Sequence, residues 1–396
     1  MTLTLLLDLD DTLLNTNLES FVPAYFQALS THLASHVPPE KMLRALVSGM
    51  RHMTENEDPS CTLQDVFESH FYSKLGVPKE ALAVVLETFY DEVFPTLQQV
   101  TSPVPEAVPF VQWAKSQGYR LAIATDPLFP RKATHHRMRW AGLDPDEFEV
   151  ISSFEHFHFS KSHPAYYAEV LGRLGWPDGP VLMVGNDLER DIFPAQRLGL
   201  ATWHVDEEPG SRSEPEAWPR GDLADLRLWL ESTDPSEFFP AFKTAESVMA
   251  LLLSSPASLS SLCADVDQSL WLHRTASDDW GLTEIACHLR DTEREIHQMQ
   301  IKLLKGQSEP FIPRPDTSVW ASQRNYMDEN GPAALNEFVQ TRMKTIAALK
   351  SVPASAWVRK ARHAIFGPTN FLEVVGFMAD HDRMHIQQAW RAIHAS

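Results

Sequence analysis

Two acidic residues follow an apolar run near the start of the chain. Asp8 and Asp10 come directly after the leucines at 5–7 and precede Thr12. Such an uncharged run predicts a buried parallel strand, whose end would bring both carboxylates to the rim of a sheet, one strand period apart. Two carboxylates on one side of a backbone repel each other unless a divalent cation or a reacting electrophile offsets their charge. The alternative is that the two acids only end the strand and begin a turn.

Three later segments carry the groups that such a site needs. One apolar run ends at Thr125, whose hydroxyl can bind an oxygen of a charged substrate at the sheet edge. Lys161 precedes a predicted helix, and its ammonium can hold a carboxylate nucleophile and an anionic substrate together. An exposed loop lysine is the alternative. A last apolar run is followed by Asp187 and Asp191, which lie on one face of a turn or helix start and can converge on a hard cation.

Taken together and in this order, these motifs resemble those of the haloacid dehalogenase superfamily of hydrolases. The resemblance implies that Asp8 is the nucleophile that forms an aspartyl-phosphate, and that Asp10 protonates the leaving group and then activates water. It also implies that Thr125 and Lys161 bind and neutralise the phosphoryl group. Asp8, Asp187 and the main-chain carbonyl of Asp10 would then help to bind Mg2+, and the substrate would be a small phosphorylated metabolite.

Details of the motifs indicate which kind of family member this chain resembles and where it departs from the family pattern. Family members that remove halide from haloalkanoates lack the second acid, because a leaving halide needs no proton. The leaving alkoxide of a phosphomonoester does need one, so the presence of Asp10 favours a phosphatase. The family commonly has Asp directly after the glycine of its last motif, but this chain has Asn186 there. Either Asn186 or Asp187 then holds the first metal position, with Asp191 as the second, and we prefer Asp187. The family's lysine is frequently followed by proline, where this chain has Ser162.

Short apolar segments recur through the first half of the chain and alternate with helical patterns. This alternation is typical of βαβ units and predicts an α/β domain, in which helices cover both faces of a parallel sheet. The family resemblance, which covers about residues 1 to 230, implies the same Rossmannoid sheet. The expected strands are Leu3–Leu7, Arg120–Ala124, Phe148–Ser152, Val181–Val184 and Ala201–Val205.

One interval, from about residue 15 to 100, has helical patterns with no strand between them. A helical insertion directly after the first strand would cover the carboxyl edge of the sheet, where ligands bind in open α/β folds. We therefore interpret it as a lid, and in the family it corresponds to the helical cap that excludes water and selects substrate. The predicted helices are Glu19–Ser35, Glu40–Met53, Leu63–Leu75 and Lys79–Phe94.

Beyond a segment rich in Glu, Pro, Ser and Gly, the pattern changes. Apolar positions recur at helical spacing through four long segments, which predicts an all-α four-helix bundle. The segments are Lys243–Leu272, Gly281–Leu304, Ala333–Ser351 and Thr369–Ala395. We expect a boundary near residue 238, with the α/β domain over 1–235 and the bundle over 243–396.

Three histidines on the predicted bundle helices have metal-ligand spacing. His381 and His385 lie one helical turn apart on one face, and His288 lies on a second helix. Together they can form a three-histidine set with an open position for water or substrate. Packed or surface histidines are the alternative. Cys287 adjoins His288, but neighbouring helical positions point about 100° apart, so we expect the thiol to pack rather than to bind metal.

The predicted bundle resembles the DinB/YfiT-like superfamily of metal-binding four-helix bundles. The resemblance rests on Trp280, His288, His381 and His385 in this order, and on Phe366-Gly367 ahead of the last helix. It implies a divalent transition metal such as Zn2+ or Ni2+, and imidazole ligands alone do not choose between these ions. Some relatives are thiol-dependent transferases or isomerases. The bundle is therefore either a metal- and thiol-dependent enzyme of this kind or a non-catalytic, metal-dependent binding or regulatory module.

Composition restricts the partners and the compartment. The chain has 396 residues, 43% of them hydrophobic, which is enough for two cores. Its net charge of −19 and its lack of a Lys/Arg-dense stripe argue against nucleic acid. Three scattered cysteines, no signal peptide and no long apolar run predict a cytoplasmic protein with no membrane partner. The composition is compatible with a homodimer. The sequence thus predicts a Mg2+-dependent phosphatase fused to a metal-binding bundle.

Overall fold

The computed structural model describes residues 2–206, 218–276 and 279–395. These residues form two compact units. The first unit takes those within Met1–Glu57, Cys61–Tyr167 and Pro177–Pro240, and the second takes those within Asp58–Ser60, Ala168–Trp176 and Ala241–Ser396. The chain passes from the first unit to the second for the last time after Pro240, next to the boundary expected near residue 238.

A six-stranded parallel sheet forms the centre of the first unit, in the order β5-β4-β1-β6-β7-β8. All four residues of β1 are buried, because this strand has a neighbour on each side and helices on its faces. Its register places Leu7 beside Ile123 and Val184, so β1, β4 and β6 end at one edge. The predicted α/β fold is confirmed. The strands are β1 (Thr4–Leu7), β4 (Arg120–Ile123), β5 (Val150–Ile151), β6 (Val181–Gly185), β7 (Ala201–Val205) and β8 (Arg220–Gly221).

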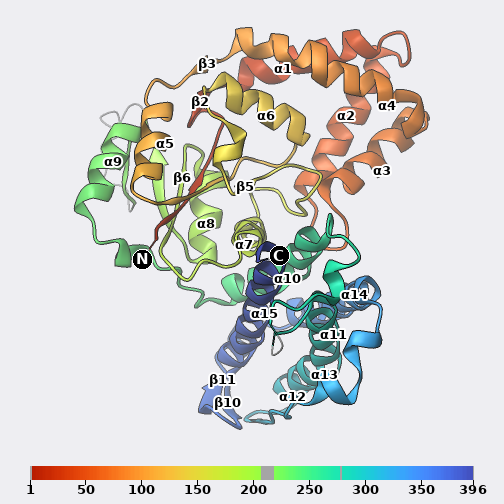
Figure 1. Ribbon diagram of the computed structural model, residues 1–396, viewed down its shortest axis with the longest axis vertical. Helices are drawn as coiled ribbons and strands as arrows, with labels where there is room; N and C mark the ends of the chain where they lie inside the picture. The colour runs from red at the N-terminus through yellow and green to blue at the C-terminus, as the bar shows by residue number, and fades with distance from the viewer. Residues whose placement is uncertain (1, 207–217, 277–278, 396) are drawn as a thin grey trace. The chain divides into compact units, whose positions relative to one another are not determined.

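An all-helical insertion separates β1 from β4. Its two connections pair antiparallel, as β2 (Leu14–Asn15) and β3 (Ser102–Pro103), so the chain leaves and rejoins the sheet domain at one place. Figure 1 shows the helices of the insertion grouped together, in red and orange. They are α1 (Leu18–Leu33), α2 (Pro39–Thr54), α3 (Leu63–Leu75) and α4 (Lys79–Thr88), followed by a π-helical turn, η1 (Phe89–Val93), and a 3-10 turn, η2 (Phe94–Val100).

One apolar core links the insertion to the sheet. Phe21 of α1 and Leu182 of β6 both belong to it, and both are completely buried. The insertion is therefore packed on the sheet domain rather than joined to it by its two connections alone. The other helices between the strands are α5 (Ala107–Ser116), α6 (Arg131–Trp140), η3 (Pro145–Glu147), α7 (Pro164–Arg173), η4 (Leu188–Ile192) and α8 (Phe193–Leu198), and β8 is followed by α9 (Leu223–Ser232) and η5 (Pro235–Phe238).

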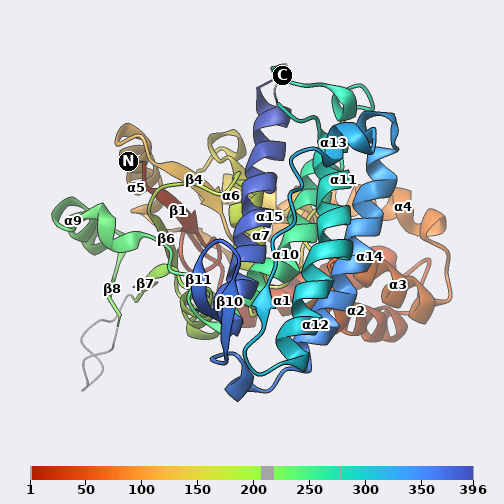
Figure 2. The ribbon, with the colours of Figure 1, turned by 90° about the horizontal axis from the view of Figure 1, so that it is seen from below.

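Four long helical segments build the second unit, as predicted. Three are α10 (Ala245–Cys263), α14 (Gly331–Lys350) and α15 (Phe371–His394). The fourth runs without a break from α11 (Leu282–Thr292) through a π-helical turn, η7 (Glu293–His297), into α12 (Gln298–Gly306). Figure 2 shows α11 and α12 in line with each other and alongside α14. A membrane-spanning helix needs about 20 mostly apolar residues, and no helix of the described residues provides them.

The second unit also contains a small sheet that the sequence analysis did not predict. Its order is β11-β10-β9, with β9 (Phe311–Ile312), β10 (Lys360–His363) and β11 (Gly367–Asn370). These strands have only two to four residues, and β11 contains glycine and proline. They are therefore too short to show the alternation of apolar and polar residues that marks a longer strand. Shorter helical turns are η6 (Leu270–Leu272), α13 (Trp320–Gln323), η8 (Tyr326–Asp328) and η9 (Ala354–Ala356).

A buried ion network connects three of the bundle segments. Arg342 of α14 donates to Glu293 Oε2 of η7 at 2.6 Å and to Asp382 Oδ2 of α15 at 2.5 Å. All three side chains are completely buried. Burial alone would raise the pKa of both carboxyls, but the guanidinium lowers it, to about 2 for Glu293. One cation thus compensates two carboxylates inside the bundle.

Replacing Arg342 by methionine would leave both carboxylates buried without a cation. We expect R342M to lower the free energy of unfolding by about 3–5 kcal/mol, the cost of breaking a buried ion pair from one side. Urea denaturation measures the loss. The control is R294M, which removes an ion pair with Glu337 whose side chains are 51% and 53% exposed, and should cost less than about 1 kcal/mol. Equal losses in the two variants would show that the buried network is not a major source of stability.

Candidate active site and metal centre

Asp8 lies at the carboxyl end of β1, in the middle of the sheet. Its backbone N–H donates to the carbonyl of Val184 at 2.9 Å, and its side chain is buried. Both carboxylate oxygens have donors: Lys161 Nζ lies 2.6 Å from Oδ1, and Thr12 Oγ1 lies 3.1 Å from Oδ2. The loop after β5 therefore delivers the predicted lysine directly to the predicted nucleophile, in a place shielded from water.

A second buried carboxylate shares the same cation. Asp191, in the π-helical turn η4 after β6, pairs with Lys161 Nζ. Burial, followed by the charge of Asp191, raises the pKa of Asp8 to about 7, and the charge of Lys161 opposes this shift. Burial alone would lower the pKa of Lys161, but the two carboxylates raise it above its ordinary value. The two carboxylates carry more negative charge than one ammonium compensates, so the donor set fits a divalent cation such as Mg2+.

Asp10 has a different set of donors. Thr16 Oγ1 donates to its Oδ1 at 2.7 Å, and Thr125 Oγ1 lies 3.5 Å from its Oδ2. Arg137 of α6 also donates to Oδ2 and is 1% exposed. Arg137 could not be predicted from the sequence, because several basic residues occupy 131–139 and their spacing does not mark the one that points inward. A buried guanidinium and two hydroxyls thus hold the Asp10 side chain in place.

Two neighbouring polar side chains of the last motif, Asn186 and Asp187, make different contacts. Asp187 Oδ1 accepts two backbone N–H groups of the following turn, at 2.9 and 3.1 Å, and its side chain is 41% exposed. Asn186 Oδ1 instead lies 3.4 Å from Thr12 Oγ1, the hydroxyl that donates to Asp8. Asp187 therefore caps its own turn, whereas Asn186 contacts a group bound to Asp8.

These side chains line one cavity of about 420 Å3. The helical insertion contributes apolar side chains to it, from α1 and from Met50 of α2. Met50, Leu128 and Phe129 also line a neighbouring cavity of about 270 Å3, whose other walls are largely aromatic and aliphatic. The insertion thus faces the site as expected for a lid. The predicted residues that the cavity brings together are Asp8, Asp10, Thr125, Lys161, Asp187 and Asp191.

The three predicted histidines of the second unit also converge. One ligand atom of each of His288, His381 and His385 lies within 4.8 Å of the others, and the Nε2 atoms of His288 and His381 are 3.0 Å apart. Burial, followed by the charges of neighbouring histidines, lowers the pKa of His288 to about 3, and burial also lowers the pKa of the other two. All three rings are therefore neutral near pH 7, the form that binds a metal.

Neighbouring groups orient these rings. His385 Nδ1 lies 3.1 Å from Gln388 Oε1, so Nδ1 carries the proton and Nε2 is left to bind a metal. The ring of Trp280 stacks on that of His385, with centroids 5.6 Å apart. Behind His381, an oxygen of Asp382 lies 3.6 Å from Nδ1. Three neutral imidazoles with such support fit a divalent transition metal such as Zn2+ or Ni2+.

Two further residues adjoin the histidines. Cys287 is buried and lies outside the cluster found among the described residues, and burial raises its pKa to about 12. His297 was not among the predicted site residues, and its ring centroid lies 5.6 Å from that of His381. Its Nδ1 lies 2.9 Å from Glu293 Oε2, one helical turn earlier. The Glu-x-x-x-His spacing was visible, but nothing in it indicates which face of the helix it occupies.

Comparison with known families matches both units. Residues 2–199, half of the chain, match the family model for haloacid dehalogenase-like hydrolases. Residues 251–389 match the model for the DinB superfamily.

Among curated proteins, pyrophosphatase PpaX of Bacillus cereus (strain AH820) is 28% identical over 215 residues, which cover 54% of this chain and 88% of that protein. Glyceraldehyde 3-phosphate phosphatase of Methanocaldococcus jannaschii is 29% identical over 103 residues, which cover 26% of this chain and 44% of that protein.

Solved structures resemble this chain at low overall similarity. A HAD phosphatase from Thermococcus onnurineus is 21% identical, with a TM-score of 0.37, and covers 58% of this chain and 98% of its own. YfiT from Bacillus subtilis, a four-helix bundle of unusual topology, is 14% identical, with a TM-score of 0.35, and covers 50% of this chain and 97% of its own.

The histidine cluster leads to a prediction about metal content. We expect the purified full-length protein to hold about one transition-metal ion per chain, and H385A to lose it, because two imidazoles bind such an ion far more weakly than three. Elemental analysis measures the content. The control is H394A, which removes an exposed histidine of the same helix and should leave the metal bound. Full metal content in H385A would rule out this cluster as the binding site.

Proposed function

Because the chain belongs to the haloacid dehalogenase-like hydrolase family, we propose that its first unit is a Mg2+-dependent phosphatase. It would hydrolyse a small phosphorylated metabolite through an aspartyl-phosphate at Asp8. One observation carries the proposal: Asp8 and Asp10 line the same cavity, with Lys161 and a threonine hydroxyl bound to Asp8. A nucleophile, a second acid and a cation that neutralises both nucleophile and phosphate are the groups that phosphoryl transfer to a carboxylate requires.

In the first step, an oxygen of Asp8 attacks phosphorus and the bond from phosphorus to the leaving oxygen breaks. Asp10 gives a proton to that oxygen. In the second step Asp10 removes a proton from water, the water oxygen attacks phosphorus, and the bond to Asp8 breaks. Arg137 and Thr16 hold Asp10 in place for both transfers, and Lys161 compensates the charge that passes between Asp8 and the phosphate.

The cation belongs beside Asp8 and Asp191, with the main-chain carbonyl of Asp10 and either Asn186 or Asp187 as further ligands. When bound, Mg2+ supplies positive charge that stabilises the phosphoryl group in the transition state. Burial, and then the charge of Asp191, raises the pKa of Asp8, and the repulsion between the two carboxylates supports a cation beside them.

For the second unit we propose a divalent transition metal, Zn2+ or Ni2+, held by His288, His381 and His385. The buried, neutral imidazoles and the DinB superfamily match support this proposal. The unit would then act either as a metal- and thiol-dependent transferase or isomerase, or as a binding or regulatory module. Assays of full-length H385A with small-thiol acceptors separate the two: lost turnover supports the enzyme, and lost metal without lost turnover supports the module.

The role of Asp8 can be tested with a generic phosphomonoester such as p-nitrophenyl phosphate. We expect D8N, measured with Mg2+, to lose activity by at least about a thousandfold, because the amide cannot form the covalent intermediate. Binding of metal by the histidine cluster should not change. The control is D146N, which alters an exposed residue outside the cavity. Activity of D8N near that of the wild type would refute the assignment.

The two candidates for the first metal position can be told apart by Mg2+ affinity. Since Asp187 caps its turn and Asn186 contacts Thr12 beside Asp8, we expect N186A to raise the Mg2+ concentration needed for half-maximal activity by about tenfold or more, as loss of a ligand does. D187A should change it less. The opposite order would favour Asp187, the preference drawn from the sequence.

A further inference from the structure

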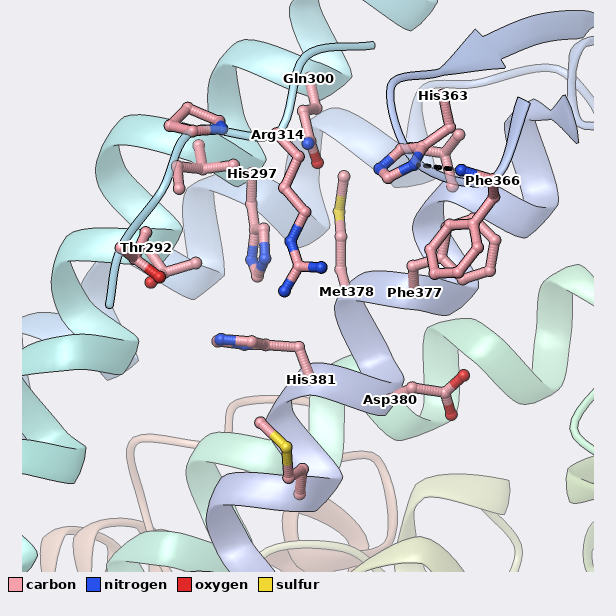
Figure 3. A pocket seen from close by; sticks show the side chains of 15 residues that line it. Thr292, His297, Gln300, Arg314, His363, Phe366, Phe377, Met378, Asp380 and His381 are labelled. Carbon is pink, nitrogen blue, oxygen red and sulfur yellow. Dashed lines mark hydrogen bonds between the residues drawn. The ribbon is translucent and has the colours of Figure 1, made fainter. Parts of the chain in front are cut away.

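A cavity of about 460 Å3 adjoins the histidine cluster of the second unit. His381 itself lines it, as does Thr292, whose Oγ1 lies 3.4 Å from His288 Nε2. Its other walls come from α12, from α15, from the loop after β9 and from the turn between β10 and β11. Figure 3 shows the ring of His381 pointing into this space from α15. The volume is that of a small-molecule site, and the cavity reaches the edge of the proposed metal centre.

One wall of the cavity is aromatic. The rings of Phe366 and Phe377 have centroids 4.3 Å apart, and the ring of His363 stacks on Phe366 with centroids 5.0 Å apart. Phe366, at the turn after β10, is 55% exposed although it is large and apolar. Met378 continues this wall toward His381. A ligand with an apolar or aromatic part would cover surface that now faces water.

The cavity also contains a cation, Arg314, which interacts electrostatically with the exposed carboxylate of Asp316 but forms no ion pair with it. Figure 3 shows the guanidinium of Arg314 in the middle of the space, between His297 and Met378. Across the described ranges, no hydrogen bond or ion pair joins Arg314 to another residue. Asp380 is the one carboxylate among the described residues that line the cavity. It pairs with Arg383 at 3.0 Å and points away from Arg314.

His363 adds a neutral donor on the opposite side. Its Nδ1 accepts the backbone N–H groups of Ile365 and Phe366, at 3.2 and 3.3 Å. This places the proton on Nε2, the ring nitrogen that faces the cavity in Figure 3. Burial, and then the charge of Arg314, lowers the pKa of His363, so the ring stays neutral. The cavity therefore offers a cation and an N–H donor to its contents, and no free carboxylate among the described lining residues.

We propose that this cavity binds a small organic anion. Its anionic group pairs with Arg314 and accepts from His363 Nε2, and its apolar part lies against Phe366 and Phe377. A metal at the three histidines strengthens this preference, because neutral imidazoles leave the charge of a divalent ion uncompensated. The proposal holds for either role of the second unit, as substrate site or as sensing site, and does not depend on the phosphatase assignment.

Calorimetric titration of the full-length, Zn2+-loaded protein tests the proposal with three probes that share a phenyl ring and differ in charge. These are phenylacetate, 2-phenylethanol and 2-phenylethylamine. We expect saturable binding of phenylacetate, with the neutral and cationic probes at least about tenfold weaker, since a charge-assisted hydrogen bond is worth that much. R314Q should weaken phenylacetate by about tenfold or more and reduce the difference among the probes. F377A should weaken phenylacetate and 2-phenylethanol alike.

The matched control is R391Q, which removes the same charge from an exposed position of α15 outside the cavity. It should bind phenylacetate as the wild type does. Elemental analysis of each variant checks that the metal is retained, so a lost anion site is distinguished from a lost metal. Unchanged phenylacetate affinity in R314Q, equal affinity for the neutral probe, or no saturable binding of phenylacetate at millimolar concentration would each overturn the proposal.

Discussion

Both units bury pairs of carboxylates, and in each unit a single cation makes that burial tolerable. Lys161 lies between Asp8 and Asp191 in the first unit, and Arg342 lies between Glu293 and Asp382 in the second. A buried charge that lacks a partner destabilises a protein by several kcal/mol. The elements that carry these side chains must therefore meet in one arrangement. In the first unit this fixes the loop after β5 against the ends of β1 and β6, and in the second it fixes α14 between η7 and α15.

The two centres differ in how the buried carboxylates titrate. At the sheet edge, burial and then the charge of Asp191 raise the pKa of Asp8 although Lys161 opposes the shift. A hard, oxygen-binding cation suits such a site. In the bundle, burial alone would raise the pKa of both carboxyls, but Arg342 lowers it together with the neighbouring rings of His297 and His381. The histidine cluster there offers neutral nitrogens instead, which would suit a softer ion and leave its charge uncompensated. The two units are thus suited to different ions and to different chemistry.

The elements that could be predicted are those with a local pattern of apolar residues in the sequence. Apolar runs located β1, β4, β6 and β7, and the parallel arrangement then placed Asp8, Thr125 and Asp191 at one edge. Arg137 and Arg342 could not be identified, because their role depends on which side of a helix is buried against a distant acid, and α6 carries several basic residues that look alike in sequence. The choice between Asn186 and Asp187 likewise depends on how one turn bends.

The turn after β6 is π-helical, and a turn of this kind occurs at both centres. Asp191 lies in the π-helical turn η4, and Glu293 and His297 lie in η7. In a regular helix, at about 100° per residue, His297 would point about 180° away from His288, nine positions earlier. A π turn absorbs one extra residue and brings His297 back toward the histidine cluster, to about 80° from His288. The long helix 282–306 is thus an ordinary helix with one residue inserted. Deleting one residue between Glu293 and His297, a change that disrupts most helices, would here make the helix regular and, by the same count, leave both His297 and α12 on their present faces.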